Sequence, residues 1–193
     1  TGSGYVAYGS GVDGAVTTAI EFEGSIYLGG AFGNGQYDLA RWTGSTWQMS
    51  AVFASKYAYV SDLHIHDGVL HAAGAMIGFT GTSYGVKRLV NGIWQNVGQD
   101  LNGEIRALET FDGALVCGGA FTGNYFSQDT SALHIARLDG NSWVQLADGL
   151  NGTVRDLLIH QQQLYAAGDC VGEIFTYFGL ARIATGANTW DLL

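Results

Sequence analysis

One short phrase of residue types occurs four times along this chain of 193 residues. The clearest copies are FEGSIYLGGAFG at residues 22–33 and FDGALVCGGAFTG at residues 111–123, and weaker copies stand at residues 66–78 and 160–172. Each copy contains a pair of small residues that ends in Gly, and these Gly residues recur after 44, 45 and 49 residues. With the Trp residues that follow each copy, the period lies in the high forties. A period of this length predicts a repeat architecture in which each unit is one supersecondary structure.

Two further markers follow every copy in the same order, first an Arg and then a Trp. They are Arg41, Arg88, Arg137 and Arg182, and Trp47, Trp94, Trp143 and Trp190. No apolar run at helical spacing accompanies them, which disfavours a helical array. Gly and Trp residues that recur at this period are typical of propeller blades of four strands. We interpret the repeating Arg as a structural contact within or between blades, with four anion sites as the alternative.

Each unit divides into four short segments with strand-like character. The first alternates between apolar and polar residues and ends at a tight turn, as at residues 60–66 before Asp67-Gly68 and residues 105–111 before Asp112-Gly113. Asp-Gly between two strand-like runs predicts a hairpin, because a type I′ turn needs positive φ at both central residues. The second segment ends in two small residues, Gly-Gly or Ala-Gly, which let backbones approach closely at a crowded centre. The third carries the Arg, and the fourth begins with the Trp, which we expect to wedge between blades.

The third unit carries a recognisable pattern: FDGALVCGGAF at residues 111–121, IARLDGNSW at residues 135–143 and GLNG at residues 149–152. This pattern resembles the Gly/Trp-rich, kelch-like β-propeller repeats of secreted bacterial surface proteins and some phage virion proteins. The resemblance covers nearly the whole chain and implies an extracellular, cell-surface or virion location. It says little about activity, because propellers host unrelated functions. Unit 2 departs most from the pattern, and unit 4 lacks the Asp-Gly turn.

The N-terminal residues match a strand that lacks its own blade. Residues 5–16 align without gaps onto residues 94–105 and 143–154, which puts Tyr5 at a Trp position. We therefore predict an all-β propeller, one domain over residues 1–193, with four full blades and one orphan outer strand. The orphan strand spans residues 5–14, and the units span about 15–50, 51–102, 103–151 and 152–193. We expect this strand to pair at the closure of the ring, although a segment cut from a longer array is the alternative.

The bulk composition excludes some classes of function. The formal net charge is −9 and the eight basic residues form no run, so the surface repels nucleic-acid phosphates. No window of 18 apolar residues occurs, so we expect no membrane span. Cys117 and Cys170 lie at unrelated repeat positions, and we favour two buried free thiols over a disulfide.

Candidate ligand-binding residues lie in the connections from second to third and from fourth to first strands. These connections vary most between units, and variable loops on a rigid scaffold are where recognition usually occurs. Aromatic rings beside Asn, Gln and Asp suit a sugar or a protein surface. The predicted ligand-binding residues are Tyr37, Tyr57, Tyr84, Asp100, Tyr125, Phe126, Phe175 and Tyr177. The alternative is that several of these rings only cap the interfaces between blades.

Catalytic and metal motifs are weak in this sequence. His64, His66 and His71 fall on two paired segments and could bind zinc. His66 stands where other units have Phe, however, which favours packing. No nucleophile elbow or phosphate loop occurs, and we expect no cofactor. We predict a non-enzymatic module that binds a glycan or a protein. The alternatives are a structural part of a virion fibre or surface appendage, assembled into a larger chain or oligomer, and a polysaccharide-active enzyme.

Overall fold

The computed structural model describes residues 8–78, 81–125, 132–169 and 179–193. Within these ranges the chain forms four antiparallel sheets of four strands each, in which neighbouring strands follow one another along the sequence. No helix occurs in the described part of the chain, and so none there could cross a membrane. The predicted all-β fold of four-stranded blades is confirmed.

Each predicted segment forms one strand, and each sheet corresponds to one sequence unit. The first sheet contains β1 (Gly14–Phe22), β2 (Ser25–Phe32), β3 (Tyr37–Trp42) and β4 (Trp47–Ser50). The second contains β5 (Tyr59–His66), β6 (Val69–Gly78), β7 (Gly81–Val90) and β8 (Ile93–Leu101). The third contains β9 (Ile105–Phe111), β10 (Ala114–Gly119), β11 (Ile135–Asp139) and β12 (Ser142–Gln145). The fourth contains β13 (Val154–His160), β14 (Gln163–Gly168), β15 (Leu180–Ala184) and β16 (Asp191–Leu192).

The tight turns between first and second strands have the predicted backbone. Asp67 and Gly68 have φ of 50° and 72°, and Asp112 and Gly113 have φ of 51° and 74°. These values are those of a type I′ turn, whose twist matches that of the flanking strands. The fourth sheet makes the same turn without glycine, at Gln161 and Gln162, with φ of 49° and 60°. The hairpin geometry therefore persists where its favoured residues are absent.

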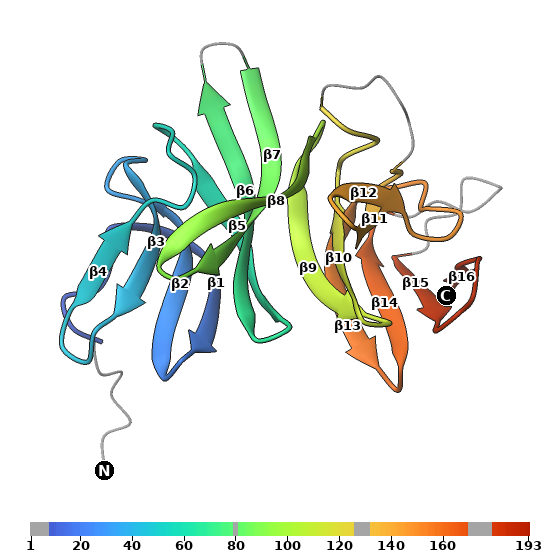
Figure 1. Cartoon of the computed structure of the whole chain (residues 1–193), viewed down its shortest axis with the longest axis horizontal. Helices are drawn as coiled ribbons and strands as arrows, with labels where there is room; N and C mark the ends of the chain where they lie inside the picture. The colour runs from blue at the N-terminus through green and yellow to red at the C-terminus, as the bar shows by residue number, and fades with distance from the viewer. Residues whose placement is uncertain (1–7, 79–80, 126–131, 170–178) are drawn as a thin grey trace.

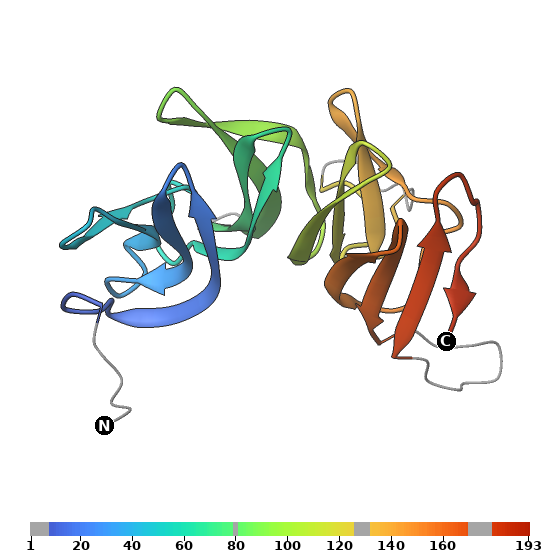
Figure 2. The same cartoon turned by 90° about the horizontal axis from the view of Figure 1, so that it is seen from below.

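The four sheets stand side by side in an open arc, with the first and the fourth at opposite ends (Figure 1; Figure 2). The first strand of each sheet lies beside the first strand of the next, in the order β1, β5, β9 and β13. We call these four the inner strands. Small residues allow the close approach: a Cβ on Gly29 would lie 2.5 Å from Val60 Cγ1, and a Cβ on Gly118 would lie 2.5 Å from Val154 Cγ1.

Three hydrophobic cores fill the three interfaces between neighbouring sheets. Trp143 is buried in the core between the second and third sheets and lies over Gly98. Trp94 and Trp190 are only half-buried and pack at the margins of the other two cores. The predicted Trp wedge is therefore complete at one interface and partial at the other two. Among the repeating Trp residues, and within the described ranges, Trp143 is the one that lies over a glycine.

The N-terminal residues differ from the expectation of ring closure. The Tyr8 ring lies 4.6 Å from the Trp42 ring between centroids, and the Tyr8 carbonyl accepts a hydrogen bond of 2.9 Å from Trp47 Nε1. Tyr8 thus packs on the first sheet, while the fourth sheet is at the far end of the arc (Figure 2). Of the predicted orphan strand over residues 5–14, residues 8–13 form no strand and Gly14 begins β1, while residues 5–7 lie outside the described residues.

Two of the repeating Arg residues, and Cys117, have structural surroundings. Arg41 donates to Ser25 Oγ, and Arg182 forms an ion pair of 3.4 Å with Asp191, so both act within their own sheet. Cys117 is a buried free thiol, as predicted, and burial raises its pKa well above the usual value. Cys170 lies outside the described residues.

Candidate functional site

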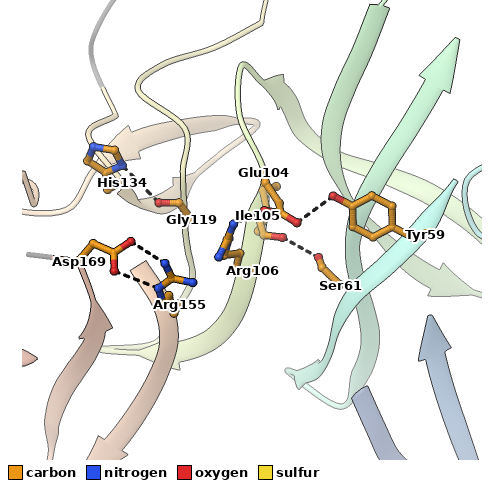
Figure 3. A network of polar contacts seen from close by, with 9 residues as sticks. All are labelled: Tyr59, Ser61, Glu104, Ile105, Arg106, Gly119, His134, Arg155 and Asp169. Atoms are coloured by element: carbon orange, nitrogen blue, oxygen red, sulfur yellow. Dashed lines mark hydrogen bonds and ion pairs between the residues drawn. The ribbon is translucent and has the colours of Figure 1, made fainter. Parts of the chain in front are cut away.

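The connections predicted to carry recognition all fall at one end of the sheets. Each inner strand starts at this end, and because the strands alternate in direction, the second-to-third and fourth-to-first connections also lie there. We call this end the mouth of the arc. Its centre carries five polar side chains, which we call the axial cluster: Tyr59, Glu104, Arg106, Arg155 and Asp169 (Figure 3).

Glu104 joins the second sheet to the third at the mouth. Its Oε1 accepts a hydrogen bond of 2.9 Å from the Tyr59 hydroxyl, and its Oε2 lies 2.6 Å from the Arg106 guanidinium. Both carboxylate oxygens therefore have a partner. Burial and then the hydrogen bond to Glu104 raise the pKa of Tyr59, so this phenol stays protonated.

The fourth sheet adds a second Arg–carboxylate pair. Arg155 contacts Asp169 through two hydrogen bonds, Nε to Oδ1 at 3.1 Å and Nη2 to Oδ2 at 2.8 Å (Figure 3). This two-pronged contact lowers the pKa of Asp169, and the charge of Arg106 on the third sheet lowers it further. The two pairs thus influence each other across an interface between sheets.

Arg106 and Arg155 stand where each inner strand has a register shift near its start. The β1–β2 and β5–β6 ladders shift register at one residue near the start of the inner strand, Thr17 and Ser61 respectively. Their hydroxyls donate to the next inner strand, to the carbonyls of Val60 and Ile105, each at 2.6 Å. Arg106 and Arg155 hold the equivalent positions in the third and fourth units. At this position the first two sheets therefore have hydroxyl side chains that bond to the next inner strand, whereas the third and fourth sheets have arginines.

The axial cluster was not predicted from the sequence. A signal exists, because the alignment of the four units puts Thr, Ser, Arg and Arg at one position. Its meaning depends on two carboxylates: Glu104, which stands two residues before Arg106, and Asp169, which meets Arg155 only once β14 pairs with β13.

Two of the predicted ligand-binding residues lie together around the connection between β2 and β3. Tyr37 begins β3 and lies against Gly33, and Tyr57 lies against Gly35, whose carbonyl accepts from Tyr57 N at 2.9 Å. Both rings are exposed, Tyr57 at 57%. Lys56 Nζ is 5.0 Å from the centroid of the Tyr57 ring. These two exposed tyrosines therefore flank the same connection, which lies at the mouth.

Three more predicted residues meet between the second and third sheets. Tyr125 is exposed; its N–H donates to the Asp100 carbonyl at 2.8 Å, and its hydroxyl lies beside Gly81. Asp100 lies against Gly85. Tyr84 is half-buried and packs on the core between these sheets, which is the capping role. The other predicted residues, Phe126, Phe175 and Tyr177, lie outside the described residues.

The three histidines of the second sheet make protein contacts. His64 Nε2 and His66 Nδ1 each lie 2.9 Å from the Thr110 hydroxyl, and His71 Nδ1 lies 2.9 Å from the Val69 carbonyl. Burial lowers the pKa of His64 and of His71. Over the described ranges, no group of three or more His, Cys, Asp or Glu is arranged to hold a metal ion.

Two carboxyl groups with a raised pKa lie outside the axial cluster, Asp38 fully buried and Asp62 partly buried. Burial raises the pKa of Asp62 to about 6, although hydrogen bonds from Leu108 N and Leu63 N act to lower this pKa. Burial also raises the pKa of Asp38, whose oxygens accept from Val52 N and Phe53 N. Backbone N–H groups hold both carboxyls in place, so their surroundings are those of structural acids.

Similar folds occur among solved structures. One is a GH74 enzyme of Niastella koreensis, with 16% identity over 94% of this chain and 30% of the enzyme, at a TM-score of 0.62. Another is the extracellular domain of a one component system protein of B. thetaiotaomicron, with 11% identity over 92% of this chain and 22% of that chain, at a TM-score of 0.59. The computationally designed Ika4 protein matches with 16% identity over 96% of this chain and all of its own length, at a TM-score of 0.56.

These likenesses concern the fold alone. The chain spans about 30% and 22% of the first two proteins that it resembles. No family model matches the chain, and no curated protein sequence matches it. The sheets and the structural likeness define a β-propeller-like protein, and the finer likeness to kelch-like repeats stays a prediction.

Proposed function

We propose that this protein is a non-enzymatic binding module whose mouth takes a neutral glycan. The axial cluster is the observation that carries the proposal, because it sets two paired arginines and two carboxylates close together at one end of the inner strands. Sugar hydroxyls both donate and accept hydrogen bonds, and this set offers both kinds of partner. Since the two positive and two negative charges balance, the cluster favours a neutral ligand over a charged one.

The exposed tyrosines at the rim support the same ligand class. Tyr37, Tyr57 and Tyr125 present ring faces with a polar end, which suits stacking against the apolar face of a sugar ring. Asp100, beside Tyr125, adds an acceptor at the rim. A protein surface with similar hydroxyl-rich chemistry is the alternative ligand from the same site.

The comparisons support a carbohydrate-related role and an extracellular location at the level of analogy. One similar structure is a GH74 enzyme and another is an extracellular domain. We propose that this chain acts outside the cell, as a secreted or surface module. A virion component with the same fold is the alternative location.

The chemistry of the carboxyl groups favours binding over catalysis. A general acid for glycoside cleavage needs a carboxyl group with a raised pKa and a free oxygen toward the substrate. Asp62 and Asp38 have the raised pKa, but backbone N–H groups occupy their oxygens. Glu104 and Asp169 face the mouth, and each is neutralised by an arginine.

A binding experiment with matched variants tests the proposal. A glycan array of neutral and acidic oligosaccharides would identify a ligand, and titration calorimetry with that oligosaccharide would measure affinity. Arg155→Gln and Tyr125→Ala should each weaken binding at least tenfold, or about 1.4 kcal/mol. Arg182→Gln is the control, because it removes an ion pair between the two outer strands of the same sheet, outside the axial cluster.

Two results would contradict the proposal. One is an array without any neutral glycan signal. The other is an equal loss of affinity in Arg155→Gln and Arg182→Gln, which would place the ligand elsewhere. Hydrolysis of the bound glycan by the wild-type protein would favour a polysaccharide-active enzyme instead.

A further inference from the structure

The first sheet leaves one face uncovered, and an apolar residue is exposed there. Val60, Ile105 and Val154 lie at or next to the start of the inner strands of the second, third and fourth sheets and are fully buried against the preceding sheet. Val16 holds the same position in the first sheet and is 47% exposed. No preceding sheet covers it among the described residues, because the fourth sheet lies at the other end of the arc (Figure 2).

The fourth sheet leaves the opposite face uncovered. An apolar hollow of about 330 Å³ lies on this face, and its lining includes Leu158, Tyr165, Ala167 and Leu180. Leu158 is 60% exposed, although it sits in the middle of β13. An exposed apolar hollow on the face of a sheet is unusual for a surface that stays in water.

The repeat shows which residue this hollow fits. Val60 seats over Gly29, which pairs with Thr18 across its own sheet, and Val154 seats over Gly118. Ala167 pairs with Asp156 in the same register, so it is the fourth-sheet equivalent of Gly29. By this equivalence, the residue that would pack on Ala167 is a Val or Ile near the start of an inner strand. Val16 is such a residue, and it is exposed.

Polar contacts between sheets give a second template. Asp62 Oδ2 accepts a hydrogen bond of 2.7 Å from Leu108 N on the next inner strand. Asp156 is the equivalent of Asp62 in the fourth sheet, and its Oδ1 accepts from Leu157 N as Asp62 Oδ1 accepts from Leu63 N. The equivalent of Leu108 in the first sheet is Ala19, so Ala19 N would donate to the carboxylate of Asp156.

We propose that the fourth sheet docks against the first sheet of a second copy of this chain, head to tail. The contact would repeat the interface that the chain already makes three times between its own sheets. If both open faces of two copies dock in this way, the pair closes with twofold symmetry. Because each copy has four sheets, the product is a ring of eight.

Docking requires one of the two terminal segments to move away, because both would occupy the same place. The Tyr8 carbonyl accepts from Trp47 Nε1 as the Leu146 carbonyl accepts from Trp190 Nε1, so Tyr8 stands where the outer strand of a preceding sheet would stand. In the docked pair, residues 191–193 of the second copy would reach the same place. β16 pairs with β15 at only two residues, so β16 is the segment that yields.

Mass measurement in solution tests the proposal. Light scattering after size exclusion, over a dilution series, should give the wild-type chain a mass of two copies. Val16→Asp and Leu158→Asp should each give one copy, because each places a charge in the contact. Ile93→Asp is the control: Ile93 is 65% exposed on the outer strand β8, and its variant should keep the mass of two copies.

Mixing the two disrupted variants tests the direction of docking. A Val16→Asp copy keeps an intact fourth sheet, and a Leu158→Asp copy keeps an intact first sheet, so their mixture should regain pairs through one contact. Deleting residues 191–193 should leave the wild-type pair intact. If either Asp variant fails to fold by circular dichroism, Val16→Thr and Leu158→Ser replace it.

Three outcomes would overturn the proposal. The first is a wild-type chain of one-copy mass at every concentration, which would assign the open faces to another partner. The second is a pair that Val16→Asp leaves intact, which would indicate contact between two fourth sheets. The third is a mixture of the two variants that stays at the mass of one copy.

Discussion

Trp143 is the side chain whose removal should most weaken the contact between the second and third sheets. Its ring is 1% exposed within the core that these sheets share. Emptying a buried aromatic site costs about 3–5 kcal/mol of unfolding free energy. Trp143 Nε1 is buried and has no hydrogen-bond partner in the described residues, and such a donor destabilises the native state by about 1–3 kcal/mol. Trp143→Ala should therefore cost near the lower limit, about 3 kcal/mol.

Thermal unfolding followed by far-ultraviolet circular dichroism would measure this cost. For a chain of this length, 1 kcal/mol corresponds to about 2–4 °C, so the midpoint should fall by about 6–12 °C. Trp143→Phe should stay within about 1 kcal/mol of wild type, because it keeps a ring and removes the unpaired N–H. Trp94→Ala should cost less than Trp143→Ala, at most about 2 kcal/mol, because Trp94 is only half-buried.

Glycine substitutions test the same contact from the opposite side. A Cβ on Gly98 would lie 2.5 Å from Trp143 Nε1, whereas a Cβ on Gly92 would meet nothing within 4 Å. Both glycines have positive φ, 69° and 78°, so Ala strains the backbone equally at each. Gly98→Ala should therefore cost at least about 1 kcal/mol more than Gly92→Ala. Equal midpoints for these two variants, or for Trp143→Ala and Trp94→Ala, would refute the buried wedge.

Two further predictions concern pH and a turn. Since the folded-state pKa of Asp62 is about 6, above its unfolded value of 3.8, its contribution to stability is present below pH 3.8 and is lost as the pH rises through 6. In Asp62→Asn, the unfolding free energy should fall less between pH 3.8 and 6 than it does in the wild-type protein. Chemical denaturation at several pH values would measure this, and an equal fall in both proteins would contradict the prediction. Gln162→Gly should raise the unfolding free energy by about 1 kcal/mol, because Gln162 has a φ of 60° where the other units have glycine. Calorimetry would measure this gain against Gln163→Gly, which should destabilise β14 instead.

The local elements of this fold follow closely from the sequence. The Asp67-Gly68 and Asp112-Gly113 turns adopt the φ values that their residue types favour. Strands begin and end near the predicted residues, because alternation and turn chemistry act over a few neighbouring residues. The small residues at Gly29 and Gly118 indicated close approach, and the structure shows which valines approach them.

The candidate site could be predicted only in part. The exposed tyrosines Tyr37, Tyr57 and Tyr125 lie at the predicted end, since strand order alone determines which connections share an end. The axial cluster required the folded chain. Arg155 and Asp169 are brought together by the β13–β14 pairing, and Tyr59 meets Glu104 across two sheets. No local pattern specifies contacts that depend on how one sheet is set against the next.

The sequence by itself determined four units, their strands and the turns between them, because each rests on backbone preferences within one unit. Only the tertiary structure decided that the sheets form an open arc, that Trp143 is buried while Trp94 is not, and that Val16 and Leu158 are left exposed. These outcomes depend on the rotation from each sheet to its neighbour. Side chains from both sheets set that rotation together, so one unit read alone does not contain it.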